Sequence, residues 1–150
     1  MCQEETVGEL DQAVGYVLKR AAVALRAAMD VALRPLELTV PQYACLELLG
    51  QRPGQSNAEL ARGTFVTRQS MNQVLRGLQE RGLVSRPATA AHGRALPTQL
   101  TPDGQRVLRT ASTAVARVQR RMLAPLTFDG QQRLQHDLAT CADAVTDTTP

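Results

Sequence analysis

The first part of the chain carries apolar residues at three- and four-residue steps, which is the spacing of an amphipathic helix. These residues run from Leu10 to Met29, and the pattern predicts one long helix over residues 7–34. Pro35 cannot continue a helix and therefore marks its end. The apolar stripe is longer than one small domain can cover, so we expect this helix to pair with a second copy of the chain.

Two more helices are predicted in the last third of the chain. Thr101, followed by a proline, is typical of a helix start, and the apolar stripe after it predicts a helix that continues to about residue 124. Pro125 ends this helix, and Thr127 can cap the next one. The apolar stripe of the last helix lies at residues 134, 138, 141 and 145.

Shorter helices are predicted in the middle of the chain, and two of them begin with the same signal. Thr39 and Gln42 have the spacing of a capping box, in which the two side chains satisfy free backbone amides at the start of a helix. Ser56 and Glu59 repeat this spacing. Both patterns therefore predict where a helix begins.

The ends of the middle helices are equally well marked. The first ends at Pro53-Gly54 and the second at Gly63. Thr67 then caps a third helix over residues 68–81, and Gly82 closes it. Two short helices joined by a tight turn form a helix-turn-helix.

A change of pattern after this motif predicts two strands. Residues 83–86 are strand-like, residues 87–93 form a loop, and residues 95–100 return as a second strand. Pro97 lacks a backbone donor, so we expect the returning strand to lie at the edge of its sheet. A hairpin directly after a helix-turn-helix is a wing, and the predicted fold is mainly α with a small β-wing.

The helix over residues 68–81 has one apolar face and one polar face. Met71, Leu75 and Leu78 share one side and are expected in the core. The second helix of a helix-turn-helix enters the major groove of DNA, and the opposite face here carries side chains that hydrogen-bond bases and phosphates. The predicted DNA-binding residues are Ser56, Thr67, Arg68, Gln69, Ser70, Asn72, Gln73 and Arg76, and, in the wing, Arg86, His92, Gly93 and Arg94.

Positive charge is concentrated in the same region. The whole chain carries a net charge of +3, but residues 62–101 hold six arginines against the single acid Glu80, a net charge of +5. Arginine is the cation best suited to phosphates and guanine edges. An ordinary solvent-exposed helix mixes Glu and Lys, so this composition favours double-stranded DNA as the partner. In the wing, the glycine beside Arg94 suits entry into a narrow minor groove.

Composition and the absence of certain motifs argue against several other classes of protein. The chain has 150 residues, 43% hydrophobic and 21% charged, which is typical of one folded domain over residues 1–150. No apolar run approaches the ~20 residues of a membrane span, and three cysteines without a close pair argue against a disulfide scaffold. Motifs of hydrolases, nucleotide-binding proteins and zinc sites are absent. We therefore expect a cytoplasmic protein that is not an enzyme and has no cofactor or metal.

Several motifs together resemble the MarR family, the multiple antibiotic resistance regulators of bacteria. The resemblance extends from about residue 10 to residue 140 and is strongest over residues 38–104. Any one motif is weak, but their order and spacing are specific. The matching pieces are Leu38–Tyr43, Glu59–Ala61, Thr67–Ser70, Leu78–Arg86, Gly93-Arg94 and Leu100–Gly104.

The resemblance implies an obligate homodimer that represses transcription from a palindromic operator. In it, residues 7–34 and 105–145 form interleaved dimerisation helices, and residues 36–104 form the winged helix-turn-helix. It also implies release by a small phenolic or carboxylate ligand. The family's wing usually has Asp-Arg-Arg, whereas this chain has His92-Gly93-Arg94 and lacks the carboxylate that would orient the wing arginine.

The resemblance places the ligand pocket among the first, second and fifth helices. Tyr16, Arg20 and Tyr43 are the residues of those helices that could hold an aromatic anion by stacking, hydrogen bonding and charge. Both tyrosines could equally be ordinary interface or core residues.

Two other functions stay open. Some members of the family sense oxidants through a thiol, which makes Cys2, Cys45 and Cys141 candidates for a redox role, although we expect all three to be structural. A winged helix can also serve as a protein-contact or dimerisation module without binding DNA. Such a module needs no basic recognition face.

Overall fold

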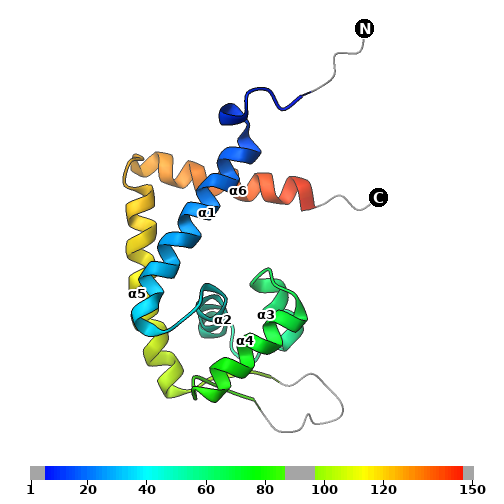
Figure 1. The fold of residues 1–150 in the computed structure, drawn as a ribbon, viewed down its shortest axis with the longest axis vertical. Helices are drawn as coiled ribbons and strands as arrows, with labels where there is room; N and C mark the ends of the chain where they lie inside the picture. Colours follow the sequence, from blue (N-terminus) through cyan, green and yellow to red (C-terminus); the bar gives the residue numbers. More distant parts are fainter. Residues whose placement is uncertain (1–5, 87–96, 147–150) are drawn as a thin grey trace.

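The computed structural model describes residues 6–86 and 97–146 (Figure 1). It is mainly helical with a small two-stranded sheet, as predicted, and the wing residues His92, Gly93 and Arg94 lie outside the described residues. The helices and strands are α1 (Val14–Leu33), α2 (Val40–Gln51), α3 (Asn57–Gly63), α4 (Arg68–Glu80), β1 (Val84–Ser85), β2 (Gln99–Leu100), α5 (Pro102–Leu123) and α6 (Phe128–Thr146), with short 3-10 turns η1 (Leu10–Gln12) and η2 (Arg34–Leu36) around α1.

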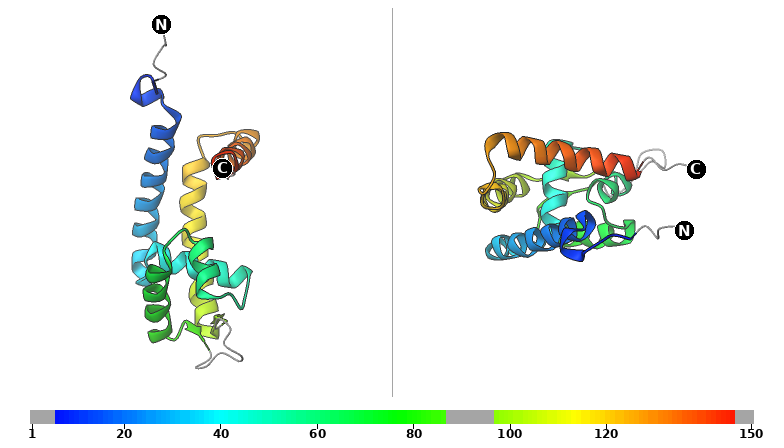
Figure 2. Two further views of the ribbon diagram at one scale, coloured as in Figure 1. Left: turned by 90° about the vertical axis from the view of Figure 1, so that its right-hand side faces the viewer. Right: turned by 90° about the horizontal axis from the view of Figure 1, so that it is seen from above.

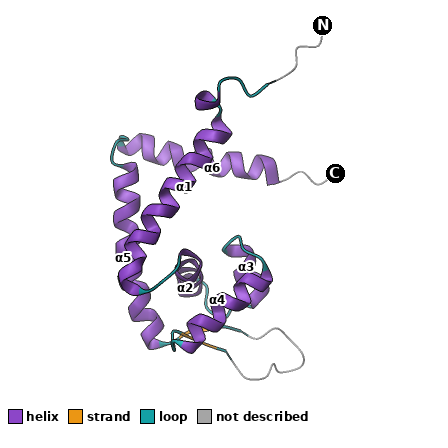
Figure 3. Cartoon of the chain, viewed as in Figure 1, coloured by secondary structure: helices purple, strands orange, loops and turns teal. Residues whose placement is uncertain are grey.

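The elements form two parts, which we call the stalk and the lobe. The stalk consists of α1, α5 and α6: α1 packs along α5, and α6 leads away from the far end of α5 at a steep angle to it (Figures 1 and 2). The lobe consists of α2, α3, α4 and the two strands, and it lies at the end of the stalk where α1 stops and α5 begins (Figure 3). Helix α5 joins the two parts, because it also packs against α2.

The hydrophobic core lies in the lobe and against the adjoining part of α5. Leu46, Leu60, Met71, Leu75 and Leu78 are fully buried there. Leu33 is the one buried residue of α1, and α6 has none. The apolar stripe of the last helix and the first half of the stripe on α1 are therefore exposed in the single chain.

The first helix is shorter than predicted. It begins at Val14 rather than at residue 7, because Ala13 is extended and offers no side chain to cap the helix. Gly8 has a left-handed backbone (φ 74°), and the residues between form the turn η1 instead of continuing α1. At the other end, α1 stops at Leu33, and the turn η2, which contains Pro35, follows directly.

The described sheet has two strands, β1 and β2, and the residue before β2 is also bridged to a third segment of the chain. Strand β2 pairs antiparallel with β1, and on its other side Thr98 bridges Gln55. The Thr98 amide donates to the Gln55 carbonyl at 2.9 Å, and the Thr98 carbonyl accepts from Gly54 at 3.0 Å. Among the described residues of this segment, pairing begins after Pro97, so the missing donor of the proline leaves no gap in the described part of the sheet.

Helix caps hold the lobe in the predicted positions. Both capping boxes are present, at Thr39 with Gln42 and at Ser56 with Glu59. Gly82 follows α4 with a left-handed backbone (φ 70°), as expected for a helix-terminating glycine. Across residues 6–86 and 97–146, no helix is long and apolar enough to cross a membrane, and no group of side chains has the arrangement of a metal site.

Candidate nucleic-acid interface

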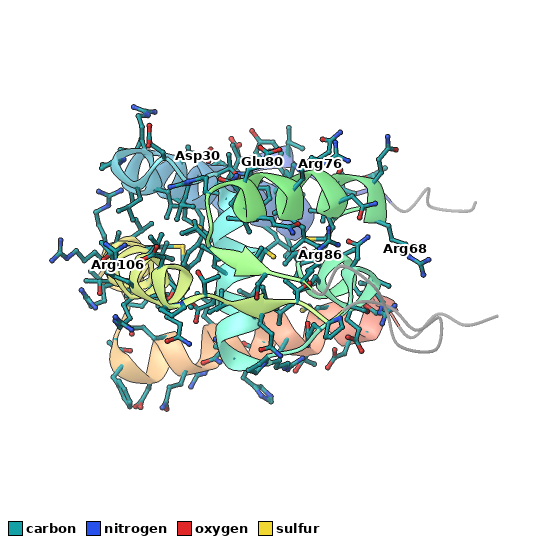
Figure 4. All side chains as sticks on the ribbon, turned by 90° about the horizontal axis from the view of Figure 1, so that it is seen from below. Asp30, Arg68, Arg76, Glu80, Arg86 and Arg106 are labelled. Atoms are coloured by element: carbon teal, nitrogen blue, oxygen red, sulfur yellow. The ribbon has the colours of Figure 1, made fainter. Side chains whose placement is uncertain are left out.

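Helix α4 is anchored by one face and open on the other. Met71, Leu75 and Leu78 are fully buried, which holds the helix against the lobe. The predicted DNA-binding side chains of α4 are all exposed, as an outward-facing polar surface requires. Figure 4 shows this side of the molecule, with α4 lying across it, Arg68 at one end of the helix and Glu80 toward the other. The exposed residues of this surface are Arg68, Gln69, Ser70, Asn72, Gln73 and Arg76.

The start of α4 is organised by Thr67. Its Oγ1 accepts a hydrogen bond from the Ser70 amide at 3.0 Å, and the Thr67 hydroxyl also donates to the Ser70 hydroxyl at 3.0 Å. Phe65, two residues before Thr67, has a left-handed backbone (φ 60°) and a 95% exposed side chain. This sharp turn directs the chain from α3 into α4, so the first turn of α4 faces outward.

The cations of α4 are available to an external anion. Neither Arg68 nor Arg76 forms a salt bridge with any described residue, and the first turn of α4 holds no acidic side chain. The free amides of a helix N-terminus add positive potential at the same place. The surface therefore combines unpaired positive charge with amide and hydroxyl groups, which is the chemistry of a phosphate and base contact.

Two predicted residues beside α4 have more local partners. Ser56 caps α3, where its Oγ accepts from the Glu59 amide at 3.2 Å. Arg86 follows β1, is half-buried and lies next to the strands in Figure 4. Both lie near the exposed face of α4 without being part of it.

One arginine of the basic segment is engaged by the fold although it is exposed. Arg81, at the end of α4, donates to the backbone carbonyls of Glu37 at 2.8 Å and Leu36 at 3.1 Å. It thereby holds α4 to the connection between α1 and α2, where Glu37 has a left-handed backbone (φ 53°). Both acceptors are neutral carbonyls, so Arg81 keeps its charge, but its guanidinium is held in place by the fold.

Sequence analysis missed Asn57, the first residue of α3. Its Nδ2 donates to Asn72 Oδ1 at 2.7 Å, which links α3 directly to the exposed face of α4. A contact between residues this far apart leaves no periodic or spacing signal in the chain. The only local hint was that Asn57 follows the capping residue Ser56.

The three predicted ligand-binding residues are not brought together within one chain. Tyr16 and Arg20 are exposed near the start of α1, whereas Tyr43 lies on α2. At about 1.5 Å per residue, Tyr16 is about 25 Å along α1 from Leu33, where the chain turns toward α2. A pocket that uses all three residues therefore needs a contribution from another chain.

Tyr43 has a partner of its own in the fold. Its hydroxyl donates to Glu47 Oε2 at 3.2 Å, and the same carboxylate accepts from Ser112 Oγ at 2.6 Å and, through Oε1, from Gln51 at 2.8 Å. Burial and the neighbouring Glu47 raise the pKa of Tyr43. Partial burial raises the pKa of Glu47, but the hydrogen bonds from Ser112, Gln51 and Tyr43 outweigh it and lower that pKa overall. Glu47 thus ties α2 to α5.

The cysteines show no sign of a reactive thiol pair among the described residues. Cys45 is fully buried in the core, and burial raises the pKa of its thiol to about 12, which suppresses the reactive thiolate. Cys141 is a free, exposed cysteine on α6. Cys2 lies outside the described residues.

Known proteins are similar to this chain in sequence and in fold. A model of the MarR family matches residues 36–95. The HTH-type transcriptional repressor Rv2887 of Mycobacterium tuberculosis is 44% identical over 128 residues, which span 85% of this chain and 92% of the relative. A transcriptional repressor of Mycobacterium bovis has the same identity and coverage.

Solved structures of transcriptional regulators are similar to this fold. Rv2887 in complex with DNA superposes with a TM-score of 0.73 at 40% identity, covering 85% of this chain and 96% of that one. Rv2887 in complex with salicylic acid gives 0.70 at 43% identity, covering 85% and 95%. The transcriptional repressor CouR, bound to a 23-mer DNA duplex, gives 0.82 at 32% identity, covering 93% and 99%. The chain therefore belongs to the MarR family and is a helix-turn-helix transcriptional regulator, not an enzyme.

Proposed function

We propose that this chain is a homodimeric repressor that binds a palindromic operator and is released by a small aromatic acid. The observation that carries the proposal is the exposed face of α4, where Arg68 and Arg76 have no anionic partner among the described residues. DNA supplies the missing anions as phosphates, and base edges supply partners for the amide side chains. The two relatives solved with DNA support this assignment. A repressor of this kind would act in the cytoplasm.

The exposed stalk supports the dimer. Val14 on α1 is 77% exposed, and Leu138 on α6 is 42% exposed, although both lie on apolar stripes. Apolar faces of this length are stable in water only when a partner covers them. A second copy of the chain would supply matching α1 and α6 stripes, and the two lobes would then present their α4 helices to half-sites one turn of DNA apart.

The proposed ligand is a benzoate-like acid, since Rv2887 was solved with salicylic and p-aminosalicylic acid. Tyr16 and Arg20 of one protomer, with Tyr43 of the other, have the aromatic and cationic groups that such an acid needs. This site exists only in the dimer, because the three residues are far apart in one chain. Ligand binding there would alter the spacing of the two lobes and so lower the affinity for the operator.

A gel-shift titration against the DNA flanking the protein's own gene tests the assignment. We expect a shift with that DNA and, if about eight phosphates are contacted, a slope of roughly −7 for log affinity against log salt. Gln69→Ala should relax base preference, whereas Arg94→Ala should weaken binding about equally on all sequences. No shift at low salt would favour a protein-contact module instead. Equal losses on operator and random DNA for both substitutions would contradict the predicted division of roles.

Sedimentation tests the proposed dimer, and a thermal shift tests the proposed ligand. The dimer proposal expects a particle of twice the chain mass at micromolar concentration, and a monomer there would contradict it. Salicylate at about 100 times its dissociation constant should add ~2.7 kcal/mol to the stability of the folded protein. It should also release the operator. Stabilisation without release would leave the protein a ligand binder but not a ligand-controlled repressor.

A further inference from the structure

Asn57 and Asn72 form a side-chain pair that joins the start of α3 to the exposed face of α4. The Nδ2 of Asn57 lies 2.7 Å from Asn72 Oδ1 and 3.5 Å from the backbone carbonyl of Arg68. The short distance makes the contact between the two amides the stronger of the two. The longer contact decides how both amides are oriented.

The orientation follows from the backbone carbonyl. A carbonyl oxygen only accepts hydrogen bonds, so the end of the Asn57 amide that faces Arg68 O must be the NH2 group. The same NH2 group faces Asn72, whose facing atom must then be an acceptor, which is Oδ1. The NH2 group of Asn72 is consequently turned away from Asn57.

This arrangement leaves the other end of the Asn57 amide without a hydrogen bond. Its own Oδ1 is buried and has no hydrogen-bond partner within the described part of the chain. An unsatisfied buried acceptor is unfavourable, and the side chain would be expected to rotate if its NH2 contacts did not outweigh that loss. The amide of Asn57 is therefore set by its contacts with α4.

We propose that Asn57 is a positioning residue that makes Asn72 present its NH2 group, and not its carbonyl, to the DNA. The inference rests on the proposed function, in which Asn72 contacts a base edge in the major groove. An unrestrained asparagine pairs with adenine by accepting from N6 and donating to N7. With Oδ1 held by Asn57, Asn72 acts as a donor. It selects edges that accept, such as guanine O6 and N7, and disfavours cytosine, which presents the N4 donor.

The first step of the test locates the base that Asn72 contacts. Wild-type protein and Asn72→Ala are titrated against a set of operators in which each position is changed in turn. The position at which Asn72→Ala abolishes base preference is the contacted position. There the wild type should favour an accepting edge such as guanine over cytosine by about tenfold.

The second step changes Asn57. Asn57→Ala frees the Asn72 amide to rotate, so the preference at that position should fall to about twofold or less, with binding to random DNA unchanged. Asn57→Asp offers only acceptors, so the Asn72 amide should turn and present Oδ1, which reverses the preference toward cytosine or adenine. Aspartate is favourable in the first turn of a helix, so this variant is expected to fold.

Ser56→Asp is the matched control for the added charge. Aspartate at the cap position retains the capping hydrogen bond, and the carboxylate is added one residue from Asn57. It should weaken binding to all operators alike through repulsion of phosphates, without a change of preference at the position that Asn72 contacts. A double variant, Asn57→Ala with Asn72→Ala, should show no further loss of preference beyond Asn72→Ala alone.

The outcomes separate the inference from the function on which it rests. If Asn72→Ala leaves every base preference intact while the wild type still shifts its operator, Asn72 does not contact a base; the positioning role is then overturned and the function stands. If the wild type shifts no DNA at low salt, the function itself is overturned. If Asn72→Ala relaxes one position while Asn57→Ala and Asn57→Asp leave that preference as in the wild type, the function stands and the positioning role of Asn57 is overturned. Loss of preference in Asn57→Ala supports the role even if the aspartate variant does not fold.

Discussion

The lobe and the stalk differ in how their apolar residues are covered. In the lobe, Leu46, Leu60 and Leu75 are fully buried by residues of the same chain. In the stalk, Val14 and Leu138 lie on helical stripes of similar character but stay exposed. The lobe thus completes its own core, whereas the stalk leaves an apolar surface that a second chain can cover. In the proposed repressor, the part that faces DNA is built within one chain, and the part that sets the spacing of two such units is built between chains.

The largest effect is expected in the core of the lobe. Leu75→Ala removes a fully buried side chain from the inner face of α4 and should lower the free energy of unfolding by about 4 kcal/mol. Urea unfolding measures this loss. The difference in unfolding free energy between the variant and the wild type should be the same at every protein concentration. A loss under 1 kcal/mol would mean that the lobe core is less complete than the buried residues indicate.

The next effect is expected where the lobe meets the stalk. A Cβ at Gly104 would overlap the backbone carbonyl oxygen of Leu83, and backbone cannot move aside cheaply. Gly104→Ala should therefore cost about 3 kcal/mol of unfolding free energy. Gly15→Ala on α1 is the control, because a Cβ there meets nothing within 4 Å in this chain. Thermal unfolding that ranks the two variants in the opposite order would contradict the close approach.

A smaller effect, of a different kind, is expected in the stalk. Leu138→Ala should weaken the dimer by about 2 kcal/mol for each side chain that the partner covers. Sedimentation at several concentrations detects this as dissociation, and the thermal midpoint becomes more dependent on concentration. His136→Ala, on the opposite side of α6 from Leu138, should change neither quantity. Equal behaviour of the two variants would show that the α6 stripe is not the covered surface.

The smallest effect is expected in the link between α2 and α5. The pKa of Glu47 is lower in the folded protein than its ordinary value, so Glu47 stabilises the fold above the pKa of the unfolded chain, about 4.3. This contribution should vanish as the pH falls through the folded-state pKa. Glu47→Gln should therefore unfold with less dependence on pH below about 5. Urea unfolding as a function of pH measures the difference, and unchanged pH dependence would contradict it.

Local signals predicted the lobe well. Capping boxes at Thr39 and Ser56, the cap at Thr67 and the glycine after α4 act over three or four residues, so the chain reveals them without its fold. The start of α1 was placed too early, because apolar periodicity continued past Ala13 although no side chain there caps a helix. The neighbour of β2 was missed, because the bridge from Thr98 to Gln55 joins distant parts of the chain.

The chain by itself determined the helix-turn-helix, its polar outer face and the excess of arginine, since periodicity and helix capping depend on near neighbours. Only the tertiary structure decided which of these side chains are free to meet a partner. Arg81 and Arg68 look alike in the sequence, yet Arg81 binds the carbonyls of Glu37 and Leu36 while Arg68 has no salt bridge with a described residue. The orientation of the Asn72 amide depends likewise on Asn57, because a hydrogen-bond partner can lie anywhere along a folded chain.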